Sequence, residues 1–319
     1  MSYSGLLAVY KPPGISSKEV SRKITRVLGK NKMGHIGTLD PIAEGVLPIL
    51  FGKATRLQDY LLSTRKSYEC DLTLGESRDT LDSEGALVDE LSFEGLTYFQ
   101  VEEKIKTFVG KQSQIPPLYS AVKYQGKPLY KYAREGKGDQ VPLHELSRQV
   151  CIHGIKLLSF ENGIIRFSAD VSKGTYIRVL AFELARSLGT LGYVSRLVRT
   201  ESSGIKLTQT VSLELLLDVL SEGESRLRDF FVDLSDINIP LMKVRFLFEQ
   251  HKNRLFRGQK LTLQLDKDFK LGEGSRVDLL NSCEEKEVLL EDGKSSLFAI
   301  ATCSKTYNGF SFKIKKGLV

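Results

Sequence analysis

The residues between positions 34 and 48 include the side chain best suited to chemistry, Asp40. An aspartate followed by a proline often caps a helix, and Asp40 before Pro41 has this ordinary explanation. The surrounding glycines, however, permit tight turns and the close approach of another backbone. They are Gly34, Gly37 and Gly45. A carboxylate on such a loop, with His35 nearby, suits a nucleophile or a general base.

Side chains that bind metals are few and badly spaced. The four cysteines never form a C-x-x-C pair and the four histidines never form an H-x-x-x-H pair, so we expect no zinc site. The stretch from Gly45 to Lys53 resembles a phosphate-binding loop, but its glycines are too far apart. The acidic residues Asp79, Asp82 and Glu84 lack the spacing of a calcium loop and are interpreted as a solvated turn. We therefore predict chemistry without a metal ion.

Basic and aromatic side chains alternate between residues 119 and 137. The cations are Lys123, Lys127, Lys131, Arg134 and Lys137, against the single acid Glu135; the tyrosines are Tyr119, Tyr124, Tyr130 and Tyr132. Cations neutralise phosphates and rings stack on bases, so this segment suits a nucleic acid. The net charge of +7 and the pI near 9.0 agree with that partner. A solvated loop with packed tyrosines explains the segment equally well.

The elements on either side of Asp40 can be predicted from hydrophobic periodicity. Ser16 and Glu19 form a capping-box pattern, and apolar residues follow at helical spacing up to Leu28. From Ser67 to Leu74 apolar and polar residues alternate, which predicts a half-buried strand with Tyr68 on its apolar side. Residues 97 to 109 predict a second helix. Residues 116 to 145 are broken by glycine and proline, and predict a long functional or mobile loop.

The second half of the chain changes character near residue 240. Strand-like alternation lies between Val150 and Val171, and an apolar stripe from Ile177 predicts a helix that Gly189 ends. A further helix is predicted over residues 211 to 221. Residues 236 to 240 look like a linker, and short strand-like runs follow it. The chain length suits this division into one large domain and a small β-rich one.

No segment of the sequence suits a membrane. The longest nearly unbroken apolar run, Val46 to Phe51, is far shorter than a membrane-spanning helix. The first 14 residues contain Lys11 and two prolines where a signal peptide needs an apolar stretch. We therefore expect a cytoplasmic protein.

Several motifs, in one order along the chain, resemble those of the TruB family of tRNA pseudouridine synthases. The longest is the segment around Asp40, from Gly34 to Pro48. The others are Lys11–Ser17, Lys66–Tyr68, residues 115 to 136, Ser172–Arg178 and Leu197–Thr200. The resemblance spans about residues 5 to 204, and the ordered set is much more specific than any single motif.

The resemblance implies that Asp40 is the catalytic residue. It either attacks the ribose or abstracts a proton next to it, and the sequence leaves both routes open. Arg178 would pair with Asp40 and hold it ionised. Tyr68 would stack on the uracil, while Tyr176 and Leu197 would line the base pocket.

The substrate implied by the resemblance is uridine 55 in the T-arm of tRNA. Its N1–C1′ bond is broken and the ring is rejoined through C5, so no atoms are gained or lost and no cofactor or metal is needed. The base must be flipped out of a folded loop. His35 would fill the vacated space, and Lys11 would support the active-site loop or a phosphate. The RNA-binding residues implied in the insertion are Lys123, Lys127, Tyr130, Lys131 and Arg134.

The fold implied by the resemblance is the α+β pseudouridine synthase fold, with helices flanking a central mixed, mainly antiparallel sheet. We expect a catalytic domain over residues 1–235, with an RNA-gripping insertion at about 115–145. A small β-rich PUA-like RNA-binding domain is expected over residues 240–319. The expected partner is the T-arm stem-loop of tRNA, bound by a monomer that requires no protein partner.

Tyr176 and Arg178 set a geometric condition, because a regular helix would place them about 200° apart. For both to reach one pocket, this stretch must be extended or only entering the helix.

Parts of the sequence are also compatible with three alternatives to a stand-alone synthase. A guide-RNA-dependent, dyskerin-like synthase is disfavoured by the tyrosine- and lysine-rich insertion. A tRNA chaperone with dispensable catalysis is disfavoured by the intact Asp40, Tyr68 and Arg178, although chaperoning stays open as a second role. A glycosidase would need a second carboxylate near Asp40, and only Glu44 offers one.

Overall fold

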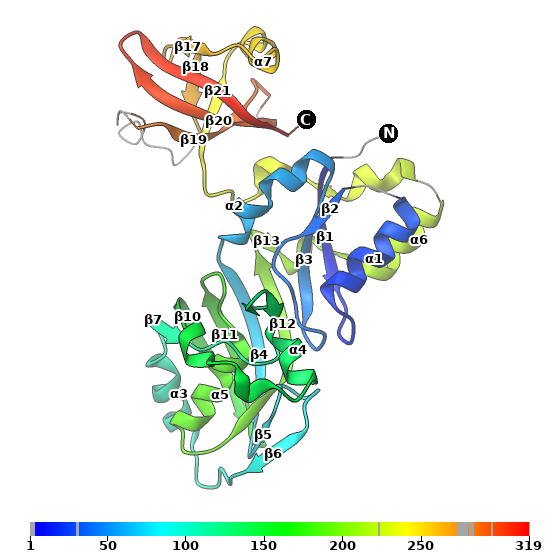
Figure 1. The fold of residues 1–319 in the computed structure, drawn as a ribbon, viewed down its shortest axis with the longest axis vertical. Helices are drawn as coiled ribbons and strands as arrows, with labels where there is room; N and C mark the ends of the chain where they lie inside the picture. The colour runs from blue at the N-terminus through cyan, green and yellow to red at the C-terminus, as the bar shows by residue number, and fades with distance from the viewer. Residues whose placement is uncertain are drawn as a thin grey trace.

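The computed structural model describes residues 4–29, 32–222, 224–272, 280, 284–294 and 296–318. These residues form a large mixed sheet with helices beside it and a smaller sheet near the C-terminus (Figure 1). Cys283 lies outside the described residues. Within the described part of the chain, no helix is long and apolar enough to cross a membrane.

The large sheet is mainly antiparallel, as predicted. Its central path runs through β14 (Val211–Ser212), β1 (Gly5–Lys11), β3 (Glu44–Phe51), β12 (Gly192–Ser202), β4 (Lys66–Leu74), β11 (Ile164–Val171), β10 (Arg148–Glu161) and β7 (Gly110–Gln114). Short strands β2 (Met33–His35), β13 (Ile205–Lys206) and β15 (Phe231–Val232) pair with β3, β12 and β1. The parallel pairs are β1 with β14 and β3 with β12.

Helices cover the sheet near both of its ends (Figure 1). They are α1 (Ser17–Leu28), α2 (Gln58–Leu62), α3 (Tyr98–Lys106), α5 (Ile177–Ser187) and α6 (Leu213–Glu222). The hydroxyl of Ser16 caps α1 by accepting the backbone N–H of Glu19 at 3.1 Å, as its sequence predicts. The apolar faces of α1, α3, α5 and α6 pack on the sheet in one core.

Strand β4 keeps the predicted alternation. Tyr68, Cys70, Leu72 and Leu74 are buried in the core, while most residues between them are partly exposed. Asp71 departs from the pattern: it is buried because the guanidinium of Arg166 on β11 holds its carboxylate at 2.8 and 2.9 Å. The strand thus presents a continuous apolar surface with Tyr68 at one end.

The segment predicted as a long loop has more structure than expected. It contains the hairpin strands β8 (Lys123–Tyr124) and β9 (Lys127–Pro128), followed by helix α4 (Leu129–Arg134). Gln125 and Gly126 take positive φ angles of 48° and 81°, which form the tight hairpin turn. Leu129 is fully buried and anchors the start of the helix. A second short hairpin, β5 (Glu76–Arg78) with β6 (Leu87–Glu90), holds the acidic turn.

The C-terminal part forms the predicted small β-rich unit. Its strands, in spatial order, are β17 (Leu261–Leu263), β21 (Gly309–Gly317), β20 (Leu297–Thr306), β19 (Lys286–Glu291), β16 (Met242–Phe246) and β18 (Phe269–Leu271), and α7 (Glu249–Phe256) packs beside them. Phe246, Phe269 and Phe312 pack edge to face in a core of their own. The exact domain limits stay a prediction.

The two units share a buried apolar contact. Ile237 and Ile239, from the predicted linker, pack with Leu6 of the large sheet and with Ile300 and Leu318 of the small one. Polar contacts join the units as well: Arg56 donates to the carbonyl of Gly317 at 2.6 Å, and the Tyr60 hydroxyl donates to Glu287 at 2.6 Å. The linker is therefore part of a packed interface.

Candidate active site

Asp40 lies on the loop between β2 and β3, and its side chain is 33% exposed. It caps no helix, because the chain runs directly from this loop into β3; the ordinary explanation for Asp40 before Pro41 is wrong. The loop is pinned on one side by Ser17, whose hydroxyl accepts the Leu39 N–H at 2.8 Å. The backbone N–H of Gly14 donates to the Pro41 carbonyl at 2.8 Å.

Two fully buried cations hold the Asp40 loop from inside. The Lys11 ammonium donates to the carbonyls of Pro41 at 3.1 Å and Ala43 at 2.5 Å. Arg199 donates through Nε to the Val46 carbonyl at 2.7 Å and through Nη2 to the Gly37 carbonyl at 2.9 Å. Burial lowers the pKa of Lys11 to about 8, although the negative charge of Asp40 acts in the opposite direction.

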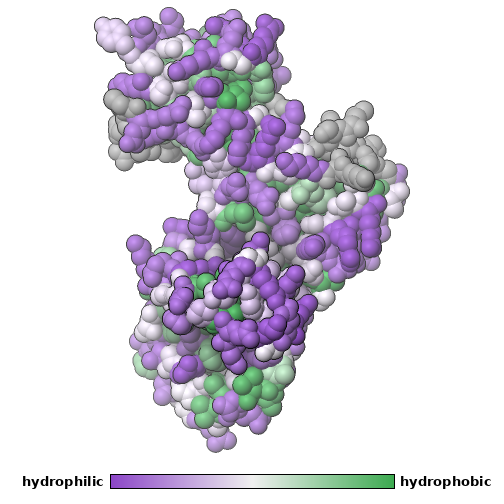
Figure 2. All heavy atoms as spheres, in the orientation of Figure 1, coloured by the Kyte–Doolittle hydropathy of each residue, from purple (hydrophilic) through white to green (hydrophobic). Residues whose placement is uncertain are grey.

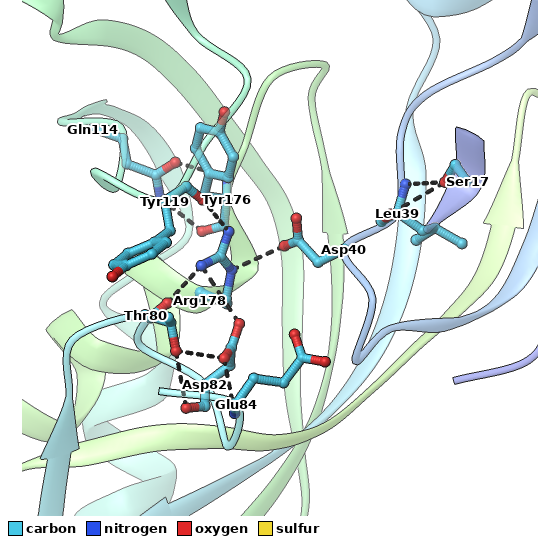
Figure 3. A network of polar contacts seen from close by, with 10 residues as sticks. All are labelled: Ser17, Leu39, Asp40, Thr80, Asp82, Glu84, Gln114, Tyr119, Tyr176 and Arg178. Carbon is cyan, nitrogen blue, oxygen red and sulfur yellow. Dashed lines mark hydrogen bonds and ion pairs between the residues drawn. The ribbon is translucent and has the colours of Figure 1, made fainter. Parts of the chain in front are cut away.

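Arg178 joins Asp40 to two other segments (Figure 3). Its Nε donates to Asp40 Oδ2 at 2.9 Å, while Nη1 and Nη2 donate to the carbonyls of Thr80 at 2.5 Å and Tyr119 at 2.9 Å. The side chain is only 3% exposed. Asp82 completes the surroundings, with Oδ2 at 3.5 Å from Nη1. A planar guanidinium with this many fixed partners can hold the Asp40 carboxylate in one orientation.

The backbone at Tyr176 meets the condition set by the sequence. Tyr176 is extended, with φ −93° and ψ 112°, and α5 begins only at Ile177. The side-chain amide of Gln114 secures this conformation: its oxygen accepts the Tyr176 N–H at 2.7 Å, and its nitrogen donates to the Tyr176 carbonyl at 3.1 Å (Figure 3). Tyr176 and Arg178 can therefore serve the same site.

A cavity of about 350 Å³ opens beside Asp40. Its lining includes four residues of the predicted site: Asp40, Tyr68, Tyr176 and Leu197. It also includes three cations that sequence reasoning missed: Lys66, Arg148 and Arg199. The guanidinium of Arg148 lies 4.5 Å from the centre of the Tyr176 ring. Arg178 and Lys11 are not lining residues. Arg178 binds the lining residue Asp40, and Lys11 binds the backbone of the loop that carries Asp40.

His35 lies beside the loop, outside the lining of the cavity. Its Nδ1 is 3.4 Å from the Ser21 hydroxyl on α1, and its Nε2 is 3.3 Å from the Thr38 hydroxyl. Burial and the charge of Arg199 lower its pKa, which favours a neutral ring. Its side chain is partly exposed between α1 and the loop.

The predicted RNA-binding residues do not all point freely to solvent. Lys127 forms a 2.5 Å ion pair with Glu135 and lies 4.6 Å above the Tyr132 ring. Arg134 lies 5.5 Å from the Tyr130 ring and is exposed, as are Lys123 and Lys131. Figure 2 shows hydrophilic side chains over α4 and over the outer side of α1.

The interpretation of the acidic turn as solvated holds for the exposed Asp79 and Glu84 but is wrong for Asp82. Asp82 is 3% exposed, and its Oδ1 accepts the Thr80 hydroxyl at 2.5 Å and the Glu84 N–H at 3.1 Å. Burial raises its pKa, while Thr80 and Arg178 act in the opposite direction. No local pattern marks this role, because Asp82 meets Arg178 only when distant segments fold together.

The arrangement of side chains does not match the two-carboxylate site of a glycosidase. Glu44, the second carboxylate that a glycosidase would need, binds the Tyr10 hydroxyl and the Arg196 guanidinium. Asp40 is the one carboxylate lining the cavity among the described residues. Nor does any cluster of His, Cys, Asp and Glu in the described ranges have the arrangement of a metal site.

Solved structures share the whole architecture. A chain of a Cbf5-Nop10-Gar1 complex superposes with a TM-score of 0.72 at 25% identity, covering 99% of this chain and 85% of that one. A chain of an H/ACA RNP bound to a substrate RNA containing 2′-deoxyuridine gives a TM-score of 0.72 at 22% identity, with the same coverage. The fold is the pseudouridine synthase fold, with a PUA-like C-terminal unit.

Sequence comparison narrows this class to one family. The model of the TruB family pseudouridylate synthase, N-terminal domain, matches residues 25–177. The tRNA pseudouridine synthase B of Dehalococcoides mccartyi is 37% identical over 262 residues, which are 82% of this chain and 85% of that protein. The enzyme of the same name from Pseudomonas fluorescens is 41% identical over 233 residues, 73% of this chain and 75% of its own. The chain belongs to the TruB family of pseudouridylate synthases, and it is an isomerase.

Proposed function

We propose that this protein converts uridine 55 in the T-arm of tRNA to pseudouridine, using Asp40 and no cofactor. The observation that carries the proposal is the Asp40–Arg178 ion pair on the wall of a cavity that Tyr68, Tyr176 and Leu197 line. The name of the relatives, tRNA pseudouridine synthase B, supports tRNA as the substrate. The position within tRNA rests on the family resemblance alone.

The chemistry asks little of the protein beyond a well-placed carboxylate. Asp40 acts on the ribose, either by attacking C1′ or by taking the proton from C2′, and both routes release the uracil ring with the electrons of the N1–C1′ bond. Arg178 holds the Asp40 carboxylate in one orientation, which both routes require. The buried Lys11 holds the loop behind it.

The cavity suits one nucleotide and not a paired stem. Its volume of about 350 Å³ is at the small end of ligand pockets, so the target base must leave its stack to enter. In our proposal Tyr68 stacks on the uracil, Tyr176 and Leu197 enclose it, and His35 occupies the space left in the RNA loop. The exposed cations Lys123 and Lys131 bind the RNA backbone near the site.

A guide-RNA-dependent activity is the second candidate, because the superposed structures include ribonucleoprotein complexes. These structures are 22–25% identical to the chain, whereas proteins named tRNA pseudouridine synthase B reach 36–41%. The higher identity favours direct action on tRNA. Assistance with tRNA folding remains compatible with this activity as a second role.

The test uses purified protein and a T-arm hairpin with tritium at C5 of the target uracil. Release of tritium without any other RNA or protein is the expected result, because all the proposed site residues lie between Lys11 and Leu197. A matched hairpin with cytidine at the target position must release nothing. If the first hairpin reacts only after a guide RNA or a partner protein is added, the guide-dependent alternative replaces the proposal.

A further inference from the structure

Two buried cations in the lining of the cavity, Lys66 and Arg199, have no carboxylate partner among the described residues. Lys66 on β4 is 7% exposed, and Arg199 on β12 is fully buried. They meet beneath Gly37: a Cβ atom there would be 3.0 Å from Lys66 Cε and 3.1 Å from Arg199 Nη1. The absence of a side chain at Gly37 thus leaves room for both cations beside the loop that carries Asp40.

The hydrogen bonds of these cations are incomplete. The ammonium of Lys66 has three N–H donors, and its contacts are the carbonyls of Thr64 at 3.1 Å and Leu62 at 3.4 Å. Arg199 uses Nε and Nη2 on backbone carbonyls, whereas Nη1 is buried without any hydrogen-bond partner among the described residues. A buried N–H donor without a hydrogen-bond acceptor destabilises the folded protein, so these donors favour the binding of a group that can accept from them.

Among the described residues, no negative charge at this site is left to neutralise the two cations. Asp40 is already paired with Arg178, and the other contacts of Lys66 and Arg199 are neutral carbonyls. Burial first, and then the charges of Arg199 and Lys173, lower the pKa of Lys66 to about 8. A negative charge that arrived in the cavity would be attracted strongly, because buried charges are poorly screened.

The part of the RNA that reaches these cations is the base. A phosphodiester continues into the strand on both sides and must stay near the mouth of a cavity for one nucleotide. The base is the free end and enters deepest. Arg199 on β12 is paired with Tyr68 on β4. Lys66 is also on β4, two positions before Tyr68, so its side chain is on the same face of the sheet. A ring stacked on Tyr68 therefore lies next to both cations.

We propose that Lys66 and Arg199 form an anion subsite for the uracil oxygens, which stabilises the ring after it separates from the ribose. The inference rests on the proposed function. When the N1–C1′ bond breaks, its electron pair leaves with the ring and spreads over N1 and the two oxygens. A cation placed where this charge develops lowers the barrier, as an oxyanion hole does.

The remaining steps conserve all atoms on either route. If an Asp40 oxygen bonds to C1′, attack by ring C5 on C1′ later displaces it. If Asp40 takes the C2′ proton, a C1′–C2′ double bond forms, and that proton returns when C5 bonds to C1′. In both cases C5 loses its proton and N1 gains one. The released uracil anion is common to both routes, so the role of Lys66 and Arg199 is the same.

Lys66→Met provides the sharper test, because Arg199 also holds the loop through Gly37 and Val46. Two T-arm hairpins are compared under single-turnover conditions, one with uridine and one with 5-fluorouridine at the target position. Fluorine withdraws electrons and makes the ring a better leaving anion. The rate at which the 5-fluorouridine hairpin is cleaved should therefore depend less on the cations. The measurement is the loss of the original nucleoside in digests of quenched reactions, which reports bond cleavage whether or not rejoining follows.

We expect Lys66→Met to slow cleavage of the uridine hairpin by roughly 10²-fold. The loss with the 5-fluorouridine hairpin should be several times smaller, and RNA affinity should change by less than about threefold. Lys66→Arg, which keeps the charge, should recover part of the uridine rate. Lys111→Met, at an exposed position on β7, is the matched control and should leave both rates unchanged.

Comparing two substrates in one protein preparation separates this role from a folding defect. Inactive or unfolded molecules reduce both rates by the same factor. Equal losses on the two hairpins would therefore overturn the anion subsite. The proposed function fails in a different way, since wild-type protein would then cleave neither hairpin.

Discussion

The guanidinium of Arg178 contacts three segments that are far apart in the sequence: the Asp40 loop, the turn at Thr80 and the start of the insertion at Tyr119. Its position in the first turn of α5, two residues after the extended Tyr176, fixes the side chain's direction. Asp40 needs this support because its carboxylate is partly exposed. The pair therefore combines a reactive group that solvent can reach with a buried group that holds it in place.

Arg178→Lys tests the importance of that orientation. A lysine keeps the positive charge but cannot hold Asp40, Thr80 and Tyr119 at the same time. We expect the single-turnover rate to fall by roughly 10²-fold or more, because small misplacements of reacting groups have effects of this size. The dissociation constant for tRNA, measured in parallel, should change far less. A variant nearly as fast as wild type would mean that Arg178 is only a nearby counter-charge.

Asp40→Asn removes the acid–base and nucleophilic capacity and keeps the shape of the side chain. Tritium release should be abolished, whereas affinity for tRNA should stay within a few-fold of wild type, because the group acts on the ribose and not on docking. Binding by filter retention and release of label are the two measurements. Turnover within tenfold of wild type contradicts the assignment of Asp40.

Among the elements, the insertion over residues 115–145 has the closest relation to the site. Near its start, the carbonyl of Tyr119 accepts a hydrogen bond from Arg178, and the Tyr119 hydroxyl donates to Asp79 at 3.2 Å in the acidic turn. Its helix α4 presents exposed cations beside tyrosine rings. This arrangement connects the RNA-binding surface that we propose to the residue that orients Asp40.

A triple variant of the insertion tests its contribution to binding. Lys123, Lys131 and Arg134 are changed to alanine, and Lys127 is retained because Glu135 already neutralises it. The logarithm of tRNA affinity against that of salt concentration should become less steep, by about 0.7 to 0.9 for each lost phosphate contact. Lys111→Ala with Lys156→Ala, at exposed positions on β7 and β10, is the control. An unchanged slope would identify the insertion as a solvated segment.

For the molecule as a whole, the buried lysines of the site lower stability at neutral pH. Lys66 has a pKa of about 8 in the native protein and an ordinary value of 10.5, so between these values the unfolded chain binds more protons. Its contribution to the free energy of unfolding therefore rises as pH increases through this window, and it is least favourable below pH 8. A functional cation is retained at the expense of stability.

Lys66→Met makes that contribution measurable, because other groups that titrate above pH 8 cancel in the comparison with wild type. The free energy of unfolding of the variant minus that of wild type should decrease from pH 8 to pH 10. The expected change is on the order of 1 to 3 kcal/mol. Denaturant titrations at several pH values measure it. A difference that stays constant with pH shows that Lys66 keeps its ordinary pKa.

Many features of this protein could be predicted from local sequence patterns and from the order of its motifs. The cap at Ser16 and the alternation through Tyr68 depend on nearby residues, so the sequence contains the information needed to predict them. The extended backbone at Tyr176 was predictable for another reason: Tyr176 and Arg178 could reach one pocket only if the helix began after Tyr176. The family, the α+β fold and the association of Asp40 with Arg178 followed from motifs in order. The roles proposed for these residues stay predictions.

Only the tertiary structure decided which other residues surround Asp40. Asp82 looked like part of a solvated turn, and Lys66 and Arg199 had no distinctive spacing, yet each reaches the site across strands from a distant segment. The insertion looked like a loop because its two hairpin strands, β8 and β9, have only two residues each and are too short to show an alternating pattern. Burial and charge pairing arise when strands align, and a linear pattern does not contain that alignment.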